Sequence, residues 1–339
     1  MLYQVSNGWR LPEFRRWFSG KYVLSEQVTP RKTKLRLIFD RTMPNFKQLF
    51  SRFFGGALPP EERNANCYIL TGIPRAGTTL TCKLLSEQEN VIGLNEPIPF
   101  RALKSEEDAL SRIHSSLAAF RHSLLKNGTA PFRGKEGEIT DNHFDQNKGE
   151  RKRVIKRTEV HFDQLLTADF RLFIKHNAVF TLLLPKLQAH YTCYAMIRNP
   201  LALLGSWSTV SMPVSRGEIR YLTLLDPQAQ RVLEQISDLP NRQLFLLDYY
   251  FKAYSILPRQ QVLRYEDLIA SNGSTLTNII GQPYRTKTVL SSKNKGAMYP
   301  RDRMLQLGSA LLADEAHHCW QFYDRSEVEA LYVYYERRE

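Results

Sequence analysis

The chain lacks a long hydrophobic run. Its 339 residues include no stretch of 18 consecutive apolar residues, so the sequence predicts no membrane span. The first thirty residues contain Arg10, Arg15, Arg16 and Lys21 without the apolar segment of a secretory signal. These absences favour a cytoplasmic protein, although a chain whose anchor had been removed would show the same pattern.

Cysteine is also scarce. The four cysteines, Cys67, Cys82, Cys193 and Cys319, show neither pairing nor metal-ligand spacing. This argues against a disulfide framework and against a cysteine-based zinc site. We expect reduced, mostly buried thiols and no metal.

Acidic residues are fewer than basic ones. The 34 Asp and Glu residues against 47 Lys and Arg residues give a formal net charge of +13. Such a surplus suits an anionic ligand, a polyanion or an acidic partner. It does not choose among them, and a charge that only keeps the protein in solution fits equally well.

What the sequence does contain is an alternation of short apolar runs and helical patterns. With 42% hydrophobic residues, the chain is able to bury a sizeable core. This alternation predicts an α/β protein with three α/β/α layers and a central parallel sheet. The runs with the character of buried strands are 68–70, 91–94, 171–174, 191–197 and 261–263. The expected helices include 80–88, 178–188, 201–210 and 222–254, and two more follow a polar loop at 291–303.

The predicted domain organisation has two parts. Residues 1–66 form an aromatic, basic segment that we expect to be helical and to pack on the core, and residues 67–339 form the main domain. An insert at about 104–170 interrupts this domain. It comprises an amphipathic helix at 106–126, a polar stretch at 127–153 that we interpret as a lid, a hairpin or a disordered insert, and a helix at 160–169.

The sequence CYILTGIPRAGTT, which begins at Cys67, has the order strand, glycine turn, helix. This order aims backbone N–H groups and a helix N-terminus at an anion. The spacing Gly72-x4-Gly77 is that of a phosphate loop, but Thr78 and Thr79 follow in place of Lys-Ser/Thr. We expect an anion cradle in which Arg75 supplies the charge and the two threonines supply hydroxyl groups. The alternative is a turn whose glycine and proline serve only the backbone.

Three segments, in order, resemble sulfotransferases that use 3′-phosphoadenosine 5′-phosphosulfate (PAPS). The segment from Gly72 to Thr79 is similar to the loop that holds the 5′-phosphosulfate. Arg198, with Ser206 after it, resembles the site for the 3′-phosphate. The sequence VLRYEDL resembles the segment whose tyrosine, here Tyr265, lies near the adenosine.

This resemblance covers roughly residues 67–268 and implies a P-loop sulfotransferase fold, with PAPS as donor and the desulfated nucleotide PAP as product. The loop residues that it implies as nucleotide contacts are Pro74, Arg75, Ala76, Gly77, Thr78 and Thr79.

The spacing is most similar to the branch that includes protein-tyrosine sulfotransferases and related bacterial enzymes. There a Glu follows the loop Arg by about twenty residues, as Glu96 follows Arg75 here, and a Lys stands near a strand end, as Lys175 does. Two features depart from the family. Val210 stands where the branch carries a second Arg, and the late glycine-rich basic segment of cytosolic sulfotransferases is missing, with Ser292 and Lys293 as loosely placed substitutes.

Sulfuryl transfer requires a cation at the leaving oxygen and a base at the acceptor. Arg75 and Lys175 are the candidates for the cation. Glu96 and His176 compete as the base. Neighbours in an extended chain point to opposite faces, and the cytosolic branch spaces its Lys and His two residues apart, where this chain has Asn177. Both points favour Glu96, and His176 stays the alternative.

The sequence therefore predicts a PAPS-dependent sulfotransferase without a metal. The expected acceptor is a hydroxyl or amine of a small hydroxylated metabolite or natural product, with a carbohydrate or a protein tyrosine as alternatives. We expect no nucleic-acid partner, and the oligomeric state stays open. A P-loop kinase or NTPase would need a Lys after Gly77 and a strand that ends in Asp for Mg²⁺, and neither is present. A non-catalytic polyanion-binding protein would explain the charge but not the ordered motifs.

Overall fold

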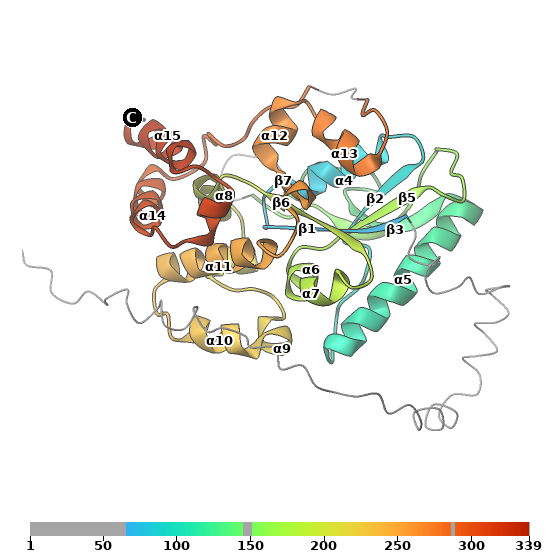
Figure 1. The fold of residues 1–339 in the computed structure, drawn as a ribbon, viewed down its shortest axis with the longest axis horizontal. Helices are drawn as coiled ribbons and strands as arrows, with labels where there is room; N and C mark the ends of the chain where they lie inside the picture. Colours follow the sequence, from blue (N-terminus) through green and yellow to red (C-terminus); the bar gives the residue numbers. More distant parts are fainter. Residues whose placement is uncertain (1–65, 145–150, 286–288, 339) are drawn as a thin grey trace, which may run out of the picture. The chain divides into compact units, whose positions relative to one another are not determined.

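Apolar segments form a parallel sheet at the centre of the fold. The computed structural model describes residues 66–144, 151–285 and 289–338, so the predicted N-terminal segment lies outside the described residues except for Asn66. Within them, five parallel strands form one sheet in the order β2-β5-β1-β6-β7 (Figure 1). These strands are β1 (Cys67–Gly72), β2 (Val91–Asn95), β5 (Arg171–Lys175), β6 (Thr192–Ile197) and β7 (Val262–Arg264). The predicted central parallel sheet is confirmed.

Helices cover both faces of this sheet, and this is why its strands are nearly continuous apolar runs. The helices on one face are α4 (Thr78–Ser86), α12 (Tyr265–Ala270) and α13 (Thr277–Ile280) (Figure 1). Those on the other are α5 (Glu106–Asn127), α6 (Ala178–Leu182), α7 (Leu184–Leu187) and α11 (Leu239–Tyr254). The result is the predicted three-layer α/β/α architecture.

Three further helices pack together at one end of the fold (Figure 1). α8 (Pro200–Trp207) follows β6 and packs on α14 (Arg301–Ala313) and α15 (Arg325–Glu336), the two predicted tail helices. The other helical segments are α9 (Leu222–Leu225), α10 (Pro227–Glu234), η1 (Pro213–Arg216), η2 (Arg259–Gln261), η3 (Ser274–Leu276) and η4 (His318–Gln321).

Proline divides two of the predicted helices. The helix expected at 222–254 is three helices, because Asp226 and Asp238 each cap a new helix that has proline in its first turn. The helix expected at 178–188 is interrupted at Leu183, just before Pro185.

The insert between β2 and β5 brings a hairpin to the carboxyl edge of the sheet, where Arg133 contacts Glu96. α5 starts at Ser105, whose side chain accepts a hydrogen bond from the N–H of Asp108, and it stops at Gly128 in a left-handed conformation. The chain then enters a hairpin of β3 (Thr129–Gly134) and β4 (Lys156–His161), which pair antiparallel. The helix predicted at 160–169 is wrong, because Val160 pairs with Ala130 in this ladder. We interpreted the polar stretch at 127–153 as a lid, a hairpin or a disordered insert. Its first part is β3, which forms a hairpin with β4.

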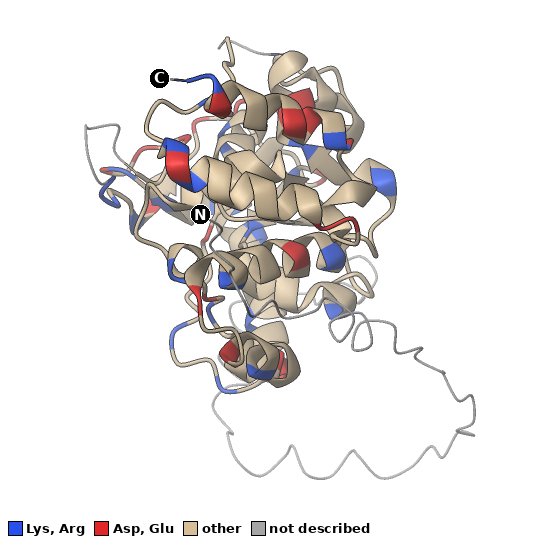
Figure 2. Cartoon of the chain, turned by 90° about the vertical axis from the view of Figure 1, so that its left-hand side faces the viewer, with Lys and Arg blue, Asp and Glu red and all other residues tan. Residues whose placement is uncertain are grey.

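Charge and hydropathy of the described part add two observations. No helix there is long and apolar enough to cross a membrane. In the view that faces α14 and α15, the ribbon positions of Lys and Arg are interspersed with those of Asp and Glu (Figure 2).

The contact between β2 and α4 depends on Gly93. A Cβ at this position would lie 2.5 Å from the carbonyl oxygen of Cys82, a backbone atom that has no room to move. We expect Gly93→Ala to lower the free energy of unfolding by about 2–3 kcal/mol through overpacking. Urea unfolding measures this change.

Gly137→Ala is the control for Gly93→Ala. A Cβ at Gly137 would meet nothing within 4 Å, although its φ is +86°. Only backbone strain remains there, so we expect Gly137→Ala to lower the free energy of unfolding by about 1 kcal/mol. Equal costs at the two positions would contradict the packing argument.

Candidate functional site

The carboxyl ends of the parallel strands gather most of the residues that the sequence singled out. The phosphate loop follows β1, Glu96 follows β2, Lys175 ends β5, and Arg198 follows β6. Tyr265 follows β7 as the first residue of α12. In open parallel sheets this edge is where ligands bind.

Glu96 and Lys175 form a buried ion pair at the centre of the edge. Lys175 Nζ lies 3.3 Å from Glu96 Oε1 and donates also to Asn95 Oδ1 at 3.3 Å. The Lys175 side chain is only 1% exposed. Glu96 has a φ of +46°, and its N–H donates to the carbonyl of Lys175 at 2.8 Å. The backbone therefore turns at Glu96 and presents its carboxylate to Lys175.

The second oxygen of Glu96 faces the β3–β4 hairpin. Arg133 donates to Glu96 Oε2 at 2.5 Å, and Arg153 lies 3.6 Å from the same oxygen. Arg157 donates to the Glu96 carbonyl from two nitrogens, each at 3.2 Å. Burial acts to raise the pKa of Glu96, but the surrounding positive charges, led by Lys175, hold it well below its ordinary value. Glu96 is therefore ionised at neutral pH.

Arg75 is anchored in the glycine turn. It adopts a φ of +77°, and the carbonyl of the preceding Pro74 accepts a hydrogen bond from Trp207 at 2.8 Å. Arg75 Nε donates to Ser206 Oγ at 3.2 Å, and its NH1 donates to Asn142 Oδ1 at 3.0 Å. Burial lowers the pKa of Arg75 to about 10, so it keeps its charge at neutral pH.

The loop residues after Arg75 lead directly into α4. Gly77 caps this helix with a φ of +92°, and a Cβ there would meet the Tyr265 ring at 2.9 Å. The first-turn N–H groups of α4, including those of Thr78 and Thr79, have no intrahelical acceptor and point toward the turn. The Thr79 hydroxyl lies 3.0 Å from His143 Nε2. Glycine is needed here because the aromatic ring packs against the turn.

Arg198 ties the loop to the tail segment. It donates to the carbonyls of Arg75 and Lys293 at 3.1 and 2.6 Å, to Asn294 Oδ1 at 2.8 Å and to Tyr299 OH at 3.2 Å. Its guanidinium group also lies over the Tyr265 ring, 4.7 Å from the centroid. Arg198, Arg75 and Ser206 are thereby brought together, although Arg198 and Ser206 each contact Arg75 rather than a shared ligand.

Lys293, one of the two tail residues predicted to contact the nucleotide, contacts Tyr265 and Arg198 through its backbone. The N–H of Lys293 donates to Tyr265 OH at 3.0 Å, and its carbonyl accepts from Arg198. The side chains of Ser292 and Lys293 are exposed. Asn294 and Tyr299, which the sequence did not single out, supply tail side chains that contact Arg198.

His176 lies beside the ion pair but faces a different environment. Its Nε2 accepts a hydrogen bond from the N–H of Ile98 at 3.2 Å, and its ring contacts Phe100 and Phe180 edge-on. Burial lowers the pKa of His176 to about 3, so it is neutral at neutral pH. Since its basic nitrogen already accepts a backbone hydrogen bond, these contacts favour Glu96 over His176 as a base.

Several residues at the site were missed from the sequence. His143 Nε2 lies 2.8 Å from Asn95 Nδ2 as well as near Thr79, and the Phe144 ring lies under Arg75 at 5.0 Å. The hairpin arginines Arg133, Arg153 and Arg157 were likewise not identified. All come from the polar stretch and its flank, where no periodicity or spacing pointed to a site. The only signal was the density of basic residues there.

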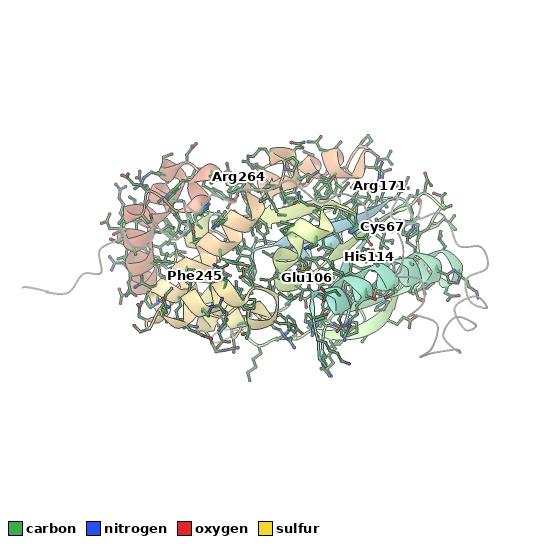
Figure 3. All side chains as sticks on the ribbon, turned by 60° about the horizontal axis from the view of Figure 1, so that its bottom comes forward. Cys67, Glu106, His114, Arg171, Phe245 and Arg264 are labelled. Atoms are coloured by element: carbon green, nitrogen blue, oxygen red, sulfur yellow. The ribbon has the colours of Figure 1, made fainter. Side chains whose placement is uncertain are left out.

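The opposite edge of the sheet carries a separate cavity of about 550 Å³. It lies where β1 and β6 begin, and Cys67 and Tyr191 line it. Cys67 and His114, both labelled in Figure 3, mark this end, since His114 Nδ1 contacts the Tyr191 hydroxyl at 2.5 Å. No cluster of three or more His, Cys, Asp or Glu side chains suited to a metal occurs in the described ranges.

Burial of neutral His176 makes stability depend on pH. Its pKa is about 3 in the folded protein and 6.5 ordinarily, so only the unfolded chain binds the proton between these values. The stabilisation is complete above pH 6.5 and is lost as the pH falls toward 3. We expect His176→Gln to reduce the slope of unfolding free energy against pH in this window by up to about 1.4 kcal/mol per pH unit. Urea titrations at several pH values measure it, with His190→Gln at an exposed histidine as the control. A slope that His176→Gln leaves unchanged would contradict neutral burial.

Comparison with known proteins gives no family for this chain. No protein-family model matches it, and no curated protein matches it. The function is therefore inferred from the chemistry of the site itself: a glycine turn with a charged Arg, a second Arg beside it, and a buried Lys–Glu pair along one sheet edge.

Proposed function

We propose that this protein is a PAPS-dependent sulfotransferase with a P-loop sulfotransferase fold. The observation that carries the proposal is the order of cationic groups along one sheet edge. Arg75 lies in the glycine turn after β1 and Arg198 follows the neighbouring β6. The Lys175–Glu96 pair lies on the other side of β1, after β5 and β2. This order suits a nucleotide with a phosphate at each end of its ribose and a sulfuryl group beyond one of them.

The donor set fits such a nucleotide. Arg75, the Thr79 hydroxyl and the N-terminus of α4 would hold the 5′-phosphosulfate, because guanidinium forks and helix N-termini both favour phosphate oxygens. Arg198 and Ser206 would hold the 3′-phosphate, and Tyr265 would lie near the adenosine. Four of the five N–H groups of Arg198 already donate to protein atoms. The 3′-phosphate would therefore accept a hydrogen bond from the fifth N–H group of Arg198 or displace one of its present acceptors.

Lys175 and Glu96 divide the chemistry. PAPS supplies a sulfuryl group on a phosphate leaving group. Lys175 is a buried ammonium next to the loop and stabilises negative charge on the leaving oxygen. Glu96 takes the proton from the acceptor hydroxyl or amine, as the family resemblance implies.

The ion pair also links the two roles. In the structure Lys175 holds Glu96 Oε1, and this attraction makes Glu96 a weak base. Anionic oxygens of a bound donor compete for the same ammonium group, so Lys175 binds Glu96 less tightly. The pKa of Glu96 then rises toward its ordinary value, and the base gains strength only when the donor is in place.

The nucleotide test compares PAP with its analogue lacking the 3′-phosphate, AMP. We expect PAP to raise the unfolding temperature and Arg198→Ala to weaken PAP binding about 10–100-fold, the effect of losing a charge-assisted hydrogen bond. AMP binding should be nearly insensitive to the same substitution, and this controls for a general disturbance of the loop. Stabilisation by ATP with Mg²⁺ but not by PAP would favour a kinase or NTPase instead.

The catalytic test separates the two candidate bases. With radiolabelled PAPS and a panel of hydroxyl and amine acceptors, we expect Glu96→Gln to lower kcat about 10²–10⁴-fold. PAP affinity should not fall, since Glu96 does not contact Arg75 or Arg198 and its loss of charge leaves Lys175 free for the nucleotide. His176→Gln should keep most of the activity. An inactive His176→Gln beside an active Glu96→Gln would reverse the assignment.

A further inference from the structure

The two oxygens of Glu96 separate its cationic neighbours into two groups. Oε1 faces Lys175, which ends β5 on the sheet. Oε2 faces Arg133 and Arg153 on the hairpin side, and Arg157 of β4 holds the Glu96 carbonyl. The hairpin cations, Arg133, Arg153 and Arg157, therefore contact atoms of the proposed base other than the oxygen that Lys175 holds.

These hairpin cations are incompletely neutralised. Glu96 is the one carboxylate that pairs with Arg133 and Arg153 among the described residues, and it also serves Lys175. Arg133 Nε is buried without a hydrogen-bond partner in the described part of the chain. Arg153 keeps 48% of its side chain exposed. Burial and the neighbouring Arg133 lower the pKa of Arg153 and Arg157, so these cations repel one another. An added anion would relieve that repulsion.

The donor nucleotide does not account for this group. Its two phosphates have Arg75 and Arg198, and its leaving oxygen has Lys175. An acceptor that Glu96 deprotonates must contact its carboxylate, and Oε2, the oxygen that Lys175 does not hold, is the one next to the hairpin cations. The hairpin cations are therefore placed to contact the acceptor.

Resting on the proposed function, we propose that Arg133, Arg153 and Arg157 form an acceptor subsite for an oxyanion. The acceptor is then a molecule that carries a carboxylate close to the hydroxyl or amine to be sulfated. The guanidinium groups of Arg133 and Arg153 already hold one carboxylate oxygen, and their planar forks match a carboxylate. A neutral hydroxylated acceptor would leave Glu96 as the one carboxylate, among the described residues, that Arg133 and Arg153 share with Lys175.

The experiment uses two matched pairs of probes with the full-length protein saturated with PAP. One pair is 4-hydroxyphenylacetate and 4-hydroxyphenylacetamide, and the other is glucuronate and glucose, so that an aromatic and a sugar hydroxy acid are distinguished. We expect the carboxylate to bind about tenfold more tightly than its neutral partner in at least one pair, as measured by calorimetry. Arg153→Gln should reduce that ratio to about threefold or less without changing PAP affinity.

Lys156→Gln is the matched control, because it removes one positive charge from an exposed position on the same hairpin. It should leave the ratio and the PAP affinity unchanged. Equal binding within both pairs, or an equal loss of preference in Lys156→Gln, overturns the subsite. Weaker PAP binding in Arg153→Gln assigns the cluster to the donor and also overturns it. The PAP titration of the unaltered protein comes first: failure to bind PAP overturns the proposed function, whereas PAP binding without charge preference overturns the subsite alone.

Discussion

The ion pair between Glu96 and Lys175 is the interaction on which the site depends. Lys175 is almost wholly buried, and a buried ammonium group without a partner is strongly unfavourable. The partner comes from β2, whose last residue is followed by a left-handed turn at Glu96 that also donates its N–H to the carbonyl of Lys175. Because the other carboxylate oxygen holds Arg133, the same residue fastens the β3–β4 hairpin to the sheet edge. One side chain thus pairs with the buried Lys175 and also holds Arg133 of the hairpin at the sheet edge.

Much of the architecture follows from local pattern. The apolar runs at 91–94, 171–174 and 191–197 became strands within a residue of the expected ends, because strands covered on both faces must be apolar throughout. Errors arose where local pattern and long-range pairing disagree. Val160 and its neighbours have a spacing compatible with a helix, but their pairing with Thr129–Gly134 makes them a strand. No short-range pattern in the sequence predicts that a strand pairs with another strand about thirty residues away.

The candidate site shows the same division. Arg75 was identified as the charge inside the glycine turn, and Glu96, Lys175 and Arg198 because they stand at strand ends and match the family resemblance. Parallel strands bring such positions to one edge. The hairpin arginines and His143 were missed because they come from a polar stretch without periodicity, which only the tertiary fold directs toward Glu96. The tail segment was placed near the nucleotide loop, but it contributes the backbone of Lys293 and the side chains of Asn294 and Tyr299, which composition does not reveal.

A crystal structure of the protein with PAP tests the central claim most directly. The account predicts the 5′-phosphate in the turn between Gly72 and Thr79, the ribose 3′-phosphate in contact with Arg198 and Ser206, and the open end of the 5′-phosphate directed toward Lys175. A nucleotide bound away from Arg198, or with its 5′-phosphate turned away from the Glu96–Lys175 pair, would contradict it.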